Sequence, residues 1–429
     1  MNEDTRSTIS RRSLLKGGAA LAAAAAAPSA LAAPTERIRA AVIGCRNRGH
    51  QVSHNFLESG QFDLVAMCDC DSAMIDRALH TLKGELENRP KPRIESDFRR
   101  ILDAKDIDAV IVAAPDHWHA EMCVMALDAG KHVYQEKPAS FCINDGKAMV
   151  AAQQRHPKQT VLVGTQQRSG RHFKEARDFV RSGGLGKVGF ARAWITQDRG
   201  ILAKVPDSDP PQTLDYNMWL GPAPKRPYNK NRVHYNWRFF HDYGTGDMGN
   251  WGAHWIDIVR WYLDLDLPRS ATTNGGTYVV HDAKEWPDTQ TVLFEYPGVS
   301  VVWELRNWTK YRVNDEGNGA EFGGDKGSLV ITRHGWTFYP RDGAPVKHAR
   351  SELEVAHASH FADCIRGQAK PVAPIEEGHK TAVCCHLGNI GVLLDRRLVL
   401  DPATLTFGDD AEANALLGRT YRKPWTLDT

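Results

Sequence analysis

The fold is decided by residues 38–69, which read IRAAVIGCRNRGHQVSHNFLESGQFDLVAMCD. The two ends of this stretch, 38–43 and 62–68, are short runs rich in β-branched and apolar residues, and the segment between them has helical character. Strand, helix and strand with short joins predict a right-handed βαβ unit in a parallel sheet. We therefore predict an α/β, doubly wound domain of the Rossmann type over residues 37–165. Its other strands are expected at residues 109–113, 132–135 and 161–164, and its helices at 50–59, 74–83, 120–129 and 145–154.

The pattern changes after residue 165. A loop rich in Pro, Asp and Asn runs from 199 to 236, and strand-like runs then follow one another without helices between them. This order predicts an α+β second domain, residues 166–429, built on an open, mainly antiparallel sheet. Its strands are expected at 289–296, 300–306, 328–332 and 336–339, and its helices at 359–367 and 376–394. The aromatic residues Tyr421 and Trp425 should pack the C-terminal tail against a neighbouring surface.

The N-terminus resembles an export signal. Residues 10–16 read SRRSLLK, a run of Gly, Ala and Leu follows, and Ala30-Leu31-Ala32 ends the segment. This pattern is typical of a twin-arginine signal peptide, residues 1–32, removed after Ala32. The alternative is a membrane anchor, but the apolar run at 17–27 is shorter than the roughly 20 residues that a bilayer requires. We expect the twin-arginine translocase to export the chain to the periplasm or beyond, with no membrane span in the mature form.

Charge and cysteine content narrow the partners further. The formal net charge is +2, and loss of residues 1–32 removes four basic and two acidic residues, which leaves a neutral chain. A neutral chain argues against nucleic acid or an acidic membrane surface as partner. The eight cysteines are scattered, and a twin-arginine substrate folds before export in a reducing compartment, so we expect few or no disulfides. Their spacing matches no zinc site, and no metal is predicted.

A loop that follows the first strand predicts a dinucleotide site. Gly44 and Gly49 occupy the first and third glycine positions of the dinucleotide fingerprint, with Arg46 in place of the second. Asp69 ends the second strand 20 residues later, where a carboxylate bonds the ribose hydroxyls and disfavours the extra phosphate of NADP. We therefore expect NAD, with NADP as the less favoured alternative, and its diphosphate on the helix N-terminus. Two possibilities for Arg46 stay open: it lies over the phosphates, or it blocks the close approach of the backbone. The loop residues assigned to the cofactor are Gly44, Arg46, Asn47, Arg48 and Gly49.

Four ordered blocks give the chain a family resemblance. They are GKHVYQEKP at 130–138, PDHWH at 115–119, GTQQR at 164–168 and GDMGNWGAHWID at 246–257. Over nearly the whole mature chain, the sequence resembles the glucose-fructose oxidoreductase, inositol dehydrogenase and rhizopine catabolism (Gfo/Idh/MocA) family. The resemblance implies a nicotinamide domain, an open-faced sheet domain used for homo-oligomer contacts, and substrate bound where the two meet.

The resemblance also implies a catalytic pair. Lys137 matches the lysine that hydrogen-bonds the reacting oxygen, and His254 matches the histidine that exchanges its proton. The chemistry supports this, because a carbinol that loses hydride must also lose a proton to a group within hydrogen-bond reach. A neighbouring cation stabilises alkoxide character. The competing interpretations are that Lys137 pairs with a surface acid and that His254 is a satisfied core histidine.

Other residues are assigned to the substrate and the cofactor. Many relatives carry an aspartate where this chain has Asn250, which can orient a hydroxyl but cannot relay a proton. Asp257, one helical turn after His254, is expected to fix its tautomer. The substrate residues are Asn250, Trp251, Arg168 and Asp257, and the further cofactor residues are Asp69, Pro115, His117, His119 and Glu136. For His117 and His119, packing at a helix start is an equal alternative.

Aromatic residues leave a further alternative open. Six tryptophans of the second domain are either sugar-stacking platforms or core, and Arg238, His241 and Asp242 are their candidate polar partners. The tryptophans are Trp194, Trp219, Trp237, Trp251, Trp255 and Trp261.

Export outside the cytoplasm, where there is no general NAD(H) pool, suggests a cofactor that stays bound. The expected reaction is oxidoreduction at a secondary hydroxyl of a sugar, cyclitol or glycoside. One alternative is an NAD-dependent glycoside hydrolase or lyase that oxidises C3 transiently and needs no pair of carboxylates. A second alternative is a non-catalytic sugar-binding relative.

Overall fold

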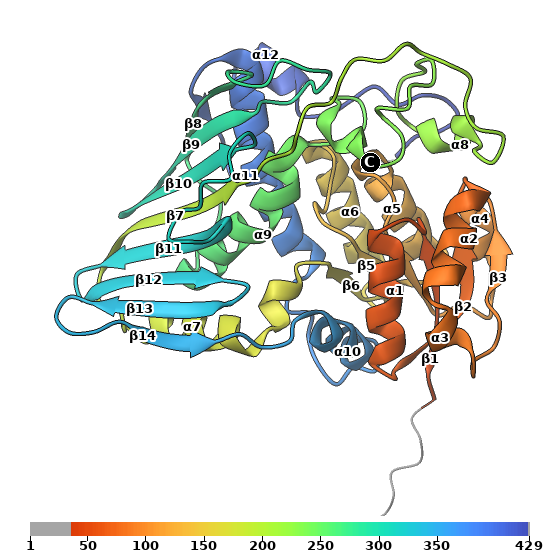
Figure 1. Ribbon diagram of the computed structural model, residues 1–429, viewed down its shortest axis with the longest axis horizontal. Helices are drawn as coiled ribbons and strands as arrows, with labels where there is room; N and C mark the ends of the chain where they lie inside the picture. Colours follow the sequence, from red (N-terminus) through yellow and green to blue (C-terminus); the bar gives the residue numbers. More distant parts are fainter. Residues whose placement is uncertain (1–35, 428–429) are drawn as a thin grey trace, which may run out of the picture. The chain divides into compact units, whose positions relative to one another are not determined.

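The computed structural model describes residues 36–427 (Figure 1). The predicted signal peptide and its cleavage after Ala32 lie outside the described residues. Within residues 36–427, no helix is both long and apolar enough to cross a membrane. All eight cysteines are free thiols.

The first sheet has six parallel strands in the order β3-β2-β1-β4-β5-β6. This is the strand order of a doubly wound dinucleotide-binding fold, so the predicted fold class of this half is confirmed. The central strands are buried on both faces and therefore read as continuous apolar runs. The strands are β1 (Ile38–Ile43), β2 (Phe62–Cys68), β3 (Arg93–Glu95), β4 (Ala109–Val112), β5 (His132–Gln135) and β6 (Val161–Val163).

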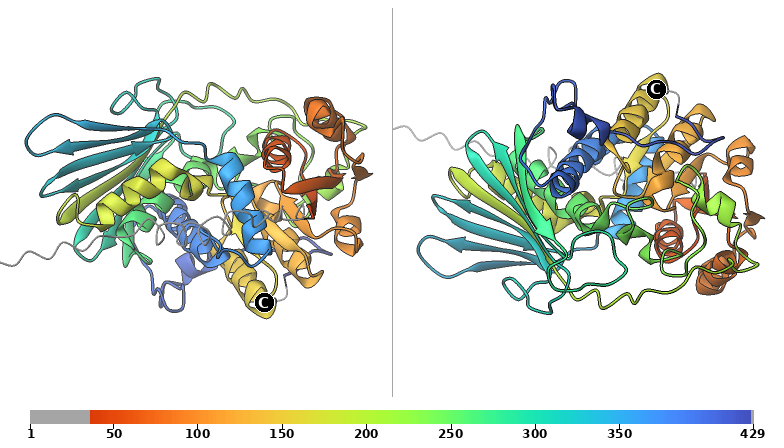
Figure 2. Two further views of the ribbon diagram at one scale, coloured as in Figure 1. Left: turned by 90° about the horizontal axis from the view of Figure 1, so that it is seen from below. Right: turned by 90° about the horizontal axis from the view of Figure 1, so that it is seen from above.

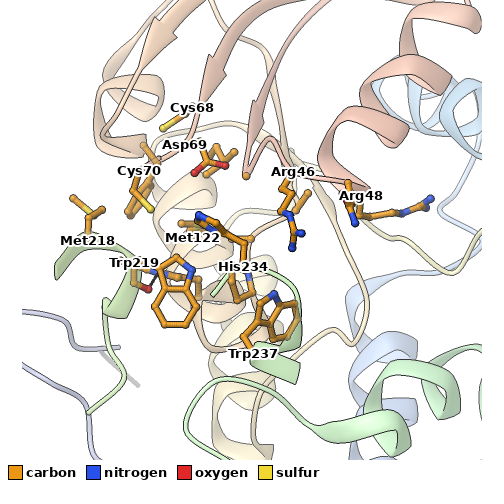
Figure 3. A pocket seen from close by; sticks show the side chains of 18 of the residues that line it. Arg46, Arg48, Cys68, Asp69, Cys70, Met122, Met218, Trp219, His234 and Trp237 are labelled. Atoms are coloured by element: carbon orange, nitrogen blue, oxygen red, sulfur yellow. Dashed lines mark hydrogen bonds between the residues drawn. The ribbon is translucent and has the colours of Figure 1, made fainter. Parts of the chain in front are cut away.

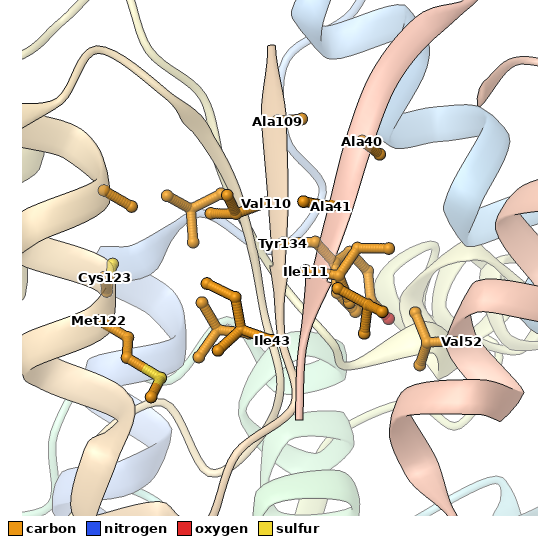
Figure 4. Packing of buried hydrophobic residues seen from close by; sticks show 14 of the residues in the cluster. Ala40, Ala41, Ile43, Val52, Ala109, Val110, Ile111, Met122, Cys123 and Tyr134 are labelled. Carbon is orange, nitrogen blue, oxygen red and sulfur yellow. The ribbon is translucent and has the colours of Figure 1, made fainter. Parts of the chain in front are cut away.

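Helices cover both faces of this sheet. Figure 4 shows Val52 of α1 on one side of β1 and β4, and Met122 and Cys123 of α5 on the other. The apolar side chains between these layers form the first core. The helices are α1 (Arg48–Glu58), α2 (Ser72–Thr81), α3 (Lys83–Leu86), α4 (Phe98–Asp103), α5 (His119–Asp128) and α6 (Ile143–Arg155), with the 3₁₀ turns η1 (Asp116–Trp118) and η2 (Gln166–Ser169).

The second sheet has nine strands in the order β14-β13-β12-β11-β7-β10-β9-β8-β15. In this sheet only β7 and β10 pair in parallel, so the prediction of a mainly antiparallel sheet is confirmed. The strands are β7 (Val188–Thr196), β8 (Ser270–Gly276), β9 (Thr289–Tyr296), β10 (Val299–Arg306), β11 (Asn318–Gly324), β12 (Gly327–Thr332), β13 (Gly335–Pro340), β14 (Val346–Ala349) and β15 (Leu398–Val399).

Three long helices pack on one face of the second sheet (Figure 2). They are α7 (Arg171–Arg181), α9 (Gly246–Leu263) and α11 (Ile375–Leu394). Side chains alternate between buried and exposed along β9, which leaves Leu293 on the opposite face. The helix α9 lies between this sheet and the first half of the chain and carries the block that resembles the family at residues 246–257.

A segment that we call the strap, residues 197–245, joins β7 to α9. It contains only α8 (Tyr216–Leu220) and η3 (Asn236–Phe239), in agreement with the long loop predicted here. The strap is tied to the first sheet beyond β2, because Ser72 N–H donates to Thr213 O at 3.1 Å and Asp215 N–H donates to Cys70 O at 2.8 Å. It therefore lies beside the carboxyl end of the parallel sheet.

The C-terminal part returns to the first core. The helix α10 (Glu354–Ile365) places Ala358 and Phe361 in the same apolar cluster as β1 and α1. Trp425 packs on Phe98 and Trp118, with ring centroids 6.1 and 4.6 Å apart, as expected for the tail. The last short helix is α12 (Ala411–Ala415). The division into residues 37–165 and 166–429 stays a prediction, and this packing shows that the first core draws on residues from beyond 166.

Candidate active site

The loop after β1 leaves no room for side chains at its two glycines. Gly44 has a φ of +90°, and a Cβ atom there would lie 2.7 Å from Ala113 O. A Cβ atom on Gly49 would lie 1.8 Å from Gly44 O. This backbone therefore requires glycine at both positions, and it leads directly into the N-terminus of α1 at Arg48. Such a turn suits the diphosphate of a dinucleotide.

Asp69 stands at the end of β2 and holds this loop. Its Oδ2 atom accepts a hydrogen bond from Cys45 N–H at 2.7 Å, and its Oδ1 atom accepts one from Asp71 N–H at 3.0 Å. Burial raises the pKa of Asp69 above its ordinary value. The carboxylate lines a cleft of about 840 Å3 whose wall also includes Gly44, Trp219 and His234. The glycine turn and this carboxylate together fit a nicotinamide dinucleotide.

Arg46 lines the same cleft. Figure 3 shows its side chain pointing toward Trp237 across the opening. Its guanidinium lies 5.6 Å from the centre of the Tyr235 ring, and burial lowers its pKa. Both possibilities for Arg46, a place over the phosphates or a block to the backbone, stay predictions.

A second cleft, of about 960 Å3, contains Lys137. Lys137 follows β5 at the carboxyl edge of the sheet, where open α/β folds bind their ligands. Its Nζ atom donates to Asn250 Oδ1 at 2.7 Å and to Asn250 O at 3.0 Å. Burial lowers the pKa of Lys137 to about 8. Lys137 therefore pairs with an amide rather than with a surface acid, and the two halves of the chain meet at this contact.

Asn250 is held in turn by Asp247, which is not among the predicted site residues. Asn250 Nδ2 donates to Asp247 Oδ1 at 3.0 Å, and Arg199 forms an ion pair with Asp247 at 2.6 Å. Asn307 Nδ2 also donates to Asp247, at 2.8 Å. Burial alone would raise the pKa of Asp247, but Arg199 and these hydrogen bonds lower it. Asp247 lies in the block at residues 246–257 that resembles the family, so a motif in the sequence pointed to it. Arg199 lies in the predicted loop, where no motif pointed to it.

His254 lies one helical turn beyond Asn250 and Trp251, which line the cleft. Its side chain is buried, and its Nδ1 atom has no hydrogen-bond partner among the described residues. Burial and the nearby charges of Arg333 and Lys137 keep its pKa well below the ordinary value. His254 is therefore a buried, neutral ring whose Nδ1 atom is unsatisfied, unlike that of a satisfied core histidine, but it lines neither of the two clefts. Its role as the histidine that exchanges the proton stays a prediction.

The expected contact between Asp257 and His254 is wrong. Asp257 is buried and forms a bidentate ion pair with Arg168, whose Nε and Nη2 atoms each donate to its carboxylate at 2.8 Å. Thr381 Oγ1 donates to the same carboxylate at 3.1 Å. The helix does place Asp257 one turn after His254, but the side chain points to Arg168. Neither Arg168 nor Asp257 lines the two clefts.

The residues predicted to meet the cofactor divide into two groups. His119 and Glu136 line the second cleft, and Pro115 lines the first. Arg48 bridges Glu136 and Glu354 at 2.7 and 2.9 Å. His117 is fully buried, with ring nitrogens facing Trp219 O and Tyr243 O, and burial lowers its pKa to about 3. Packing is thus the observed environment of His117.

The predicted aromatic platforms also divide. Trp219, Trp237 and Trp251 line the clefts, whereas Trp194 and Trp255 are fully buried core. Trp261 packs under Arg168 and Arg177. His241 and Asp242 line a separate cavity of about 1120 Å3, away from Lys137. Among residues 36–427, no group of three or more His, Cys, Asp or Glu side chains is placed to hold a metal ion.

Comparison with known proteins places both halves in one family. Residues 38–165 match the profile described as oxidoreductase family, NAD-binding Rossmann fold. Residues 186–289 and 347–427 match the C-terminal alpha/beta domain of the same family, labelled GFO_IDH_MocA. Residues 8–28 match the twin-arginine translocation signal, so the chain is directed out of the cytoplasm by that pathway.

Individual similar proteins share low sequence identity with this chain. Glycosyl hydrolase family 109 protein 1 of Shewanella sp. strain ANA-3 is 31% identical over 163 residues, which is 37% of this chain and 35% of that protein. The alpha-N-acetylgalactosaminidase of Shewanella oneidensis is 29% identical over 163 residues, again 37% and 35% of the two chains. The match spans about a third of the length of these relatives. The crystal structure of aldose-aldose oxidoreductase from Caulobacter crescentus, complexed with glycerol, has a TM-score of 0.66 at 20% identity and covers 85% of this chain and all of that one. At this identity it shows a shared fold.

Proposed function

The chain belongs to the Gfo/Idh/MocA oxidoreductase family, and we propose that it oxidises or reduces a secondary hydroxyl of a sugar, cyclitol or glycoside. The observation that carries this proposal is Lys137, a lysine with a pKa of about 8 that lines a cleft at the carboxyl edge of the parallel sheet. A buried lysine that still carries its proton near neutrality can donate a hydrogen bond to a reacting oxygen and stabilise negative charge on it. We further propose NAD rather than NADP, because Asp69 would repel a phosphate on the ribose.

A bound nicotinamide would supply the hydride acceptor or donor at the substrate carbon. The protein's part is to hold and move the proton at the substrate oxygen. In the proposed arrangement the Lys137 ammonium donates a hydrogen bond to that oxygen and stabilises its negative character. Asn250 keeps Lys137 in place, and Asp247 keeps Asn250 in place. The neutral His254 ring takes the proton when the hydroxyl is oxidised and returns it when the ketone is reduced.

The low pKa of His254 is consistent with this division of labour. A neutral ring is ready to accept a proton over the whole physiological pH range, although it is a weak base. Its weakness is offset if the substrate hydroxyl is itself acidified by contact with the Lys137 ammonium. Lys137 is therefore the group in direct contact with the reacting oxygen, and His254 completes the proton path.

Export supports a second part of the proposal, that the cofactor stays bound during turnover. The nucleotide content of the protein tests this directly. The mature protein is purified from the exported fraction and dialysed extensively, and any nucleotide is released by acid and identified by mass spectrometry. We expect about one NAD(H) per chain. A chain that emerges empty and binds added NAD only weakly would contradict a retained cofactor.

The glycosidase-named relatives favour a second candidate, cleavage of a glycoside through transient oxidation at C3. A ketone at C3 acidifies the C2–H bond, so a base can remove that proton and expel the C1 substituent. Water then adds at C1, a proton returns to C2, and the hydride returns to C3. In deuterated water this path places deuterium at C2 of the released sugar. Release of an aglycone without deuterium at C2 would contradict it.

The exposed face of the second sheet supports a proposal about assembly. Three apolar side chains of this sheet are at least 40% exposed: Leu293 on β9, Tyr339 on β13 and Val399 on the edge strand β15. We propose that this face contacts a second copy of the chain, because apolar side chains exposed on a sheet face can be covered by a protein interface. Light scattering of the purified protein would show a mass above that of the monomer.

A further inference from the structure

The two clefts share a wall at one place, between Asp69 on one side and Lys137 on the other. This junction is lined by Asn47, Arg48, Ala113 and Ala114 from the first half of the chain and by Tyr235, Trp237 and Arg238 from the strap. If a dinucleotide extends from Asp69 to Lys137, as the proposed function requires, its two halves are joined here. The group that joins them is a diphosphate, which carries two negative charges.

Arg238 offers the junction an uncompensated positive charge. Its Nε atom is buried without a hydrogen-bond partner, and its guanidinium lies 4.4 Å from the Tyr235 ring centre and 5.0 Å from a Trp237 ring centre. Two carboxylates, those of Asp247 and Asp116, raise the pKa of Arg238 through their charge, but neither bonds it. Asp247 forms its ion pair with Arg199, and Asp116 accepts a hydrogen bond from Thr245. Among the described residues, Arg238 therefore contacts aromatic rings and no acid.

Arg46, which lines the first cleft, also lacks a bonded acid among the described residues. Its guanidinium lies over the same Tyr235 ring, 5.6 Å from the centre, and no carboxylate within residues 36–427 bonds it. Burial lowers the pKa of Arg46, and the positive charges of Arg77 and Arg238 lower it further. The other arginines that line these clefts differ, because Arg48 and Arg199 both form ion pairs.

Two guanidinium groups that face one cleft, with no acid among the described residues bonded to either, are costly. Removal of a charge from water is compensated only by a partner of opposite charge, and like charges close together add repulsion. A diphosphate between them would compensate both, and guanidinium groups bind phosphate oxygens with two parallel hydrogen bonds.

We propose that Arg238 of the strap and Arg46 of the glycine turn form a two-arginine clamp for the cofactor diphosphate. The clamp closes the strap over the cofactor and slows its release after export. The strap is held in position for this task, because His234 Nε2 and Asp71 Oδ2 are 2.6 Å apart and the backbone bonds at Thr213 and Asp215 flank that contact. This inference rests on the proposed function and adds a retention device to it.

The substitution Arg238→Gln tests the clamp. Wild type and variant are loaded with the fluorescent analogue etheno-NAD, and its release is followed after excess unlabelled NAD is added. Loss of a charge-assisted contact to phosphate predicts release about 10- to 100-fold faster in the variant. The affinity for ADP-ribose should fall by a similar factor, whereas the affinity for adenosine, which lacks phosphate, should stay the same. Arg238→Lys keeps the positive charge but loses the paired N–H donors of the guanidinium, so its rate of etheno-NAD release should lie between those of wild type and Arg238→Gln.

Two controls separate loss of the clamp from a general effect of charge or of misfolding. Lys225→Gln removes one charge from an exposed position of the same strap and should release etheno-NAD at the wild-type rate. If Arg238→Gln does not fold, wild-type release is compared at low and high salt, and the clamp predicts faster release at high salt. Unchanged release and unchanged ADP-ribose affinity in Arg238→Gln would overturn the clamp, and a raised KM for an acidic substrate alone would assign Arg238 to the substrate instead. A wild-type protein that binds no NAD would overturn the proposed function itself.

Discussion

The ammonium group of Lys137 donates to both oxygen atoms that Asn250 offers, its side-chain Oδ1 at 2.7 Å and its backbone O at 3.0 Å. One residue comes from the end of β5 and the other from the first turns of α9, so this contact joins the two halves of the chain at the site of the proposed reaction. Burial favours the neutral form of Lys137, and the nearby Glu136 carboxylate favours the charged form. Donation to the two Asn250 oxygen atoms also favours the charged form. The balance sets the pH range in which the proposed chemistry can operate.

The pH dependence of the wild type follows from this balance. The proposed role needs a protonated Lys137, so kcat/KM for substrate oxidation should fall as pH rises through about 8, the pKa of Lys137. The pKa of His254 lies well below its ordinary value of 6.5, so we expect no loss of rate as pH falls through that ordinary value. Initial rates measured across this range provide the check. A rate that rises through pH 8 would mean that neutral Lys137 acts as the base.

Substitution of Asn250 by alanine should shift the pH at which kcat/KM falls on the alkaline side. Loss of the Oδ1 acceptor removes a hydrogen bond to the charged form of Lys137 and lowers its pKa further, by about 1. The alkaline loss of kcat/KM should therefore begin about one pH unit lower than in the wild type. Asn217→Ala, in the strap but outside the two clefts, provides the control. If kcat/KM of Asn250→Ala falls at the same pH as in the wild type, the titrating group is not Lys137.

The Arg168–Asp257 pair predicts a loss of stability. Asp257→Asn removes the carboxylate that accepts both hydrogen bonds of the buried Arg168 guanidinium and leaves it the more distant Glu377, at 3.8 Å. Loss of one partner of a buried ion pair typically costs about 3–5 kcal/mol. The Tm of this variant should fall, and KM for substrate should stay near the wild-type value because neither residue lines the clefts. Thermal unfolding and steady-state kinetics measure the two quantities. A normal Tm with a raised KM would restore the substrate-binding role that the sequence suggested.

The glycine turn predicts a loss of cofactor binding. In Gly49→Ala the new methyl group would overlap Gly44 O, so the turn that faces the diphosphate must open. Nucleotide released from the purified variant should fall far below that of the wild type. Gly84→Ala is the matched control, because it lies in a short helix with open space around it. Full NAD content in Gly49→Ala would contradict the placement of the diphosphate at this turn.

The sequence predicted those parts of the molecule that local patterns determine. Strands β1, β2 and β5 were correct to the residue, because buried parallel strands read as uninterrupted apolar runs between turn residues. Short or edge strands such as β3 and β15 were not expected, since two or three residues carry no periodicity. The return of α10 to the first core could not be predicted either, because it depends on packing between residues about 300 positions apart, such as Arg48 and Glu354.

The site shows the same division. Several residues that line the clefts were singled out from the sequence, Gly44 and Asp69 from the dinucleotide fingerprint and Lys137 and Asn250 from the family blocks. Their roles stay predictions. The partner of Asp257 was assigned wrongly, because helical spacing gives proximity to His254 but not the direction of the side chain. Arg238 appeared only as a companion of tryptophans, since the absence of an acid beside it is a property of the folded chain.

The proposed mechanism depends above all on Lys137 serving hydride transfer between substrate and a bound nicotinamide. A single turnover tests this dependence: the exported protein with its cofactor is mixed with a panel of sugars and glycosides, and the near-ultraviolet absorbance of reduced nicotinamide is recorded. We expect at least one compound to reduce the bound cofactor in the wild type. In Lys137→Ala, with the same NAD content, this reduction should be roughly 10²–10⁴-fold slower. Equal rates of reduction in wild type and Lys137→Ala would contradict the mechanism.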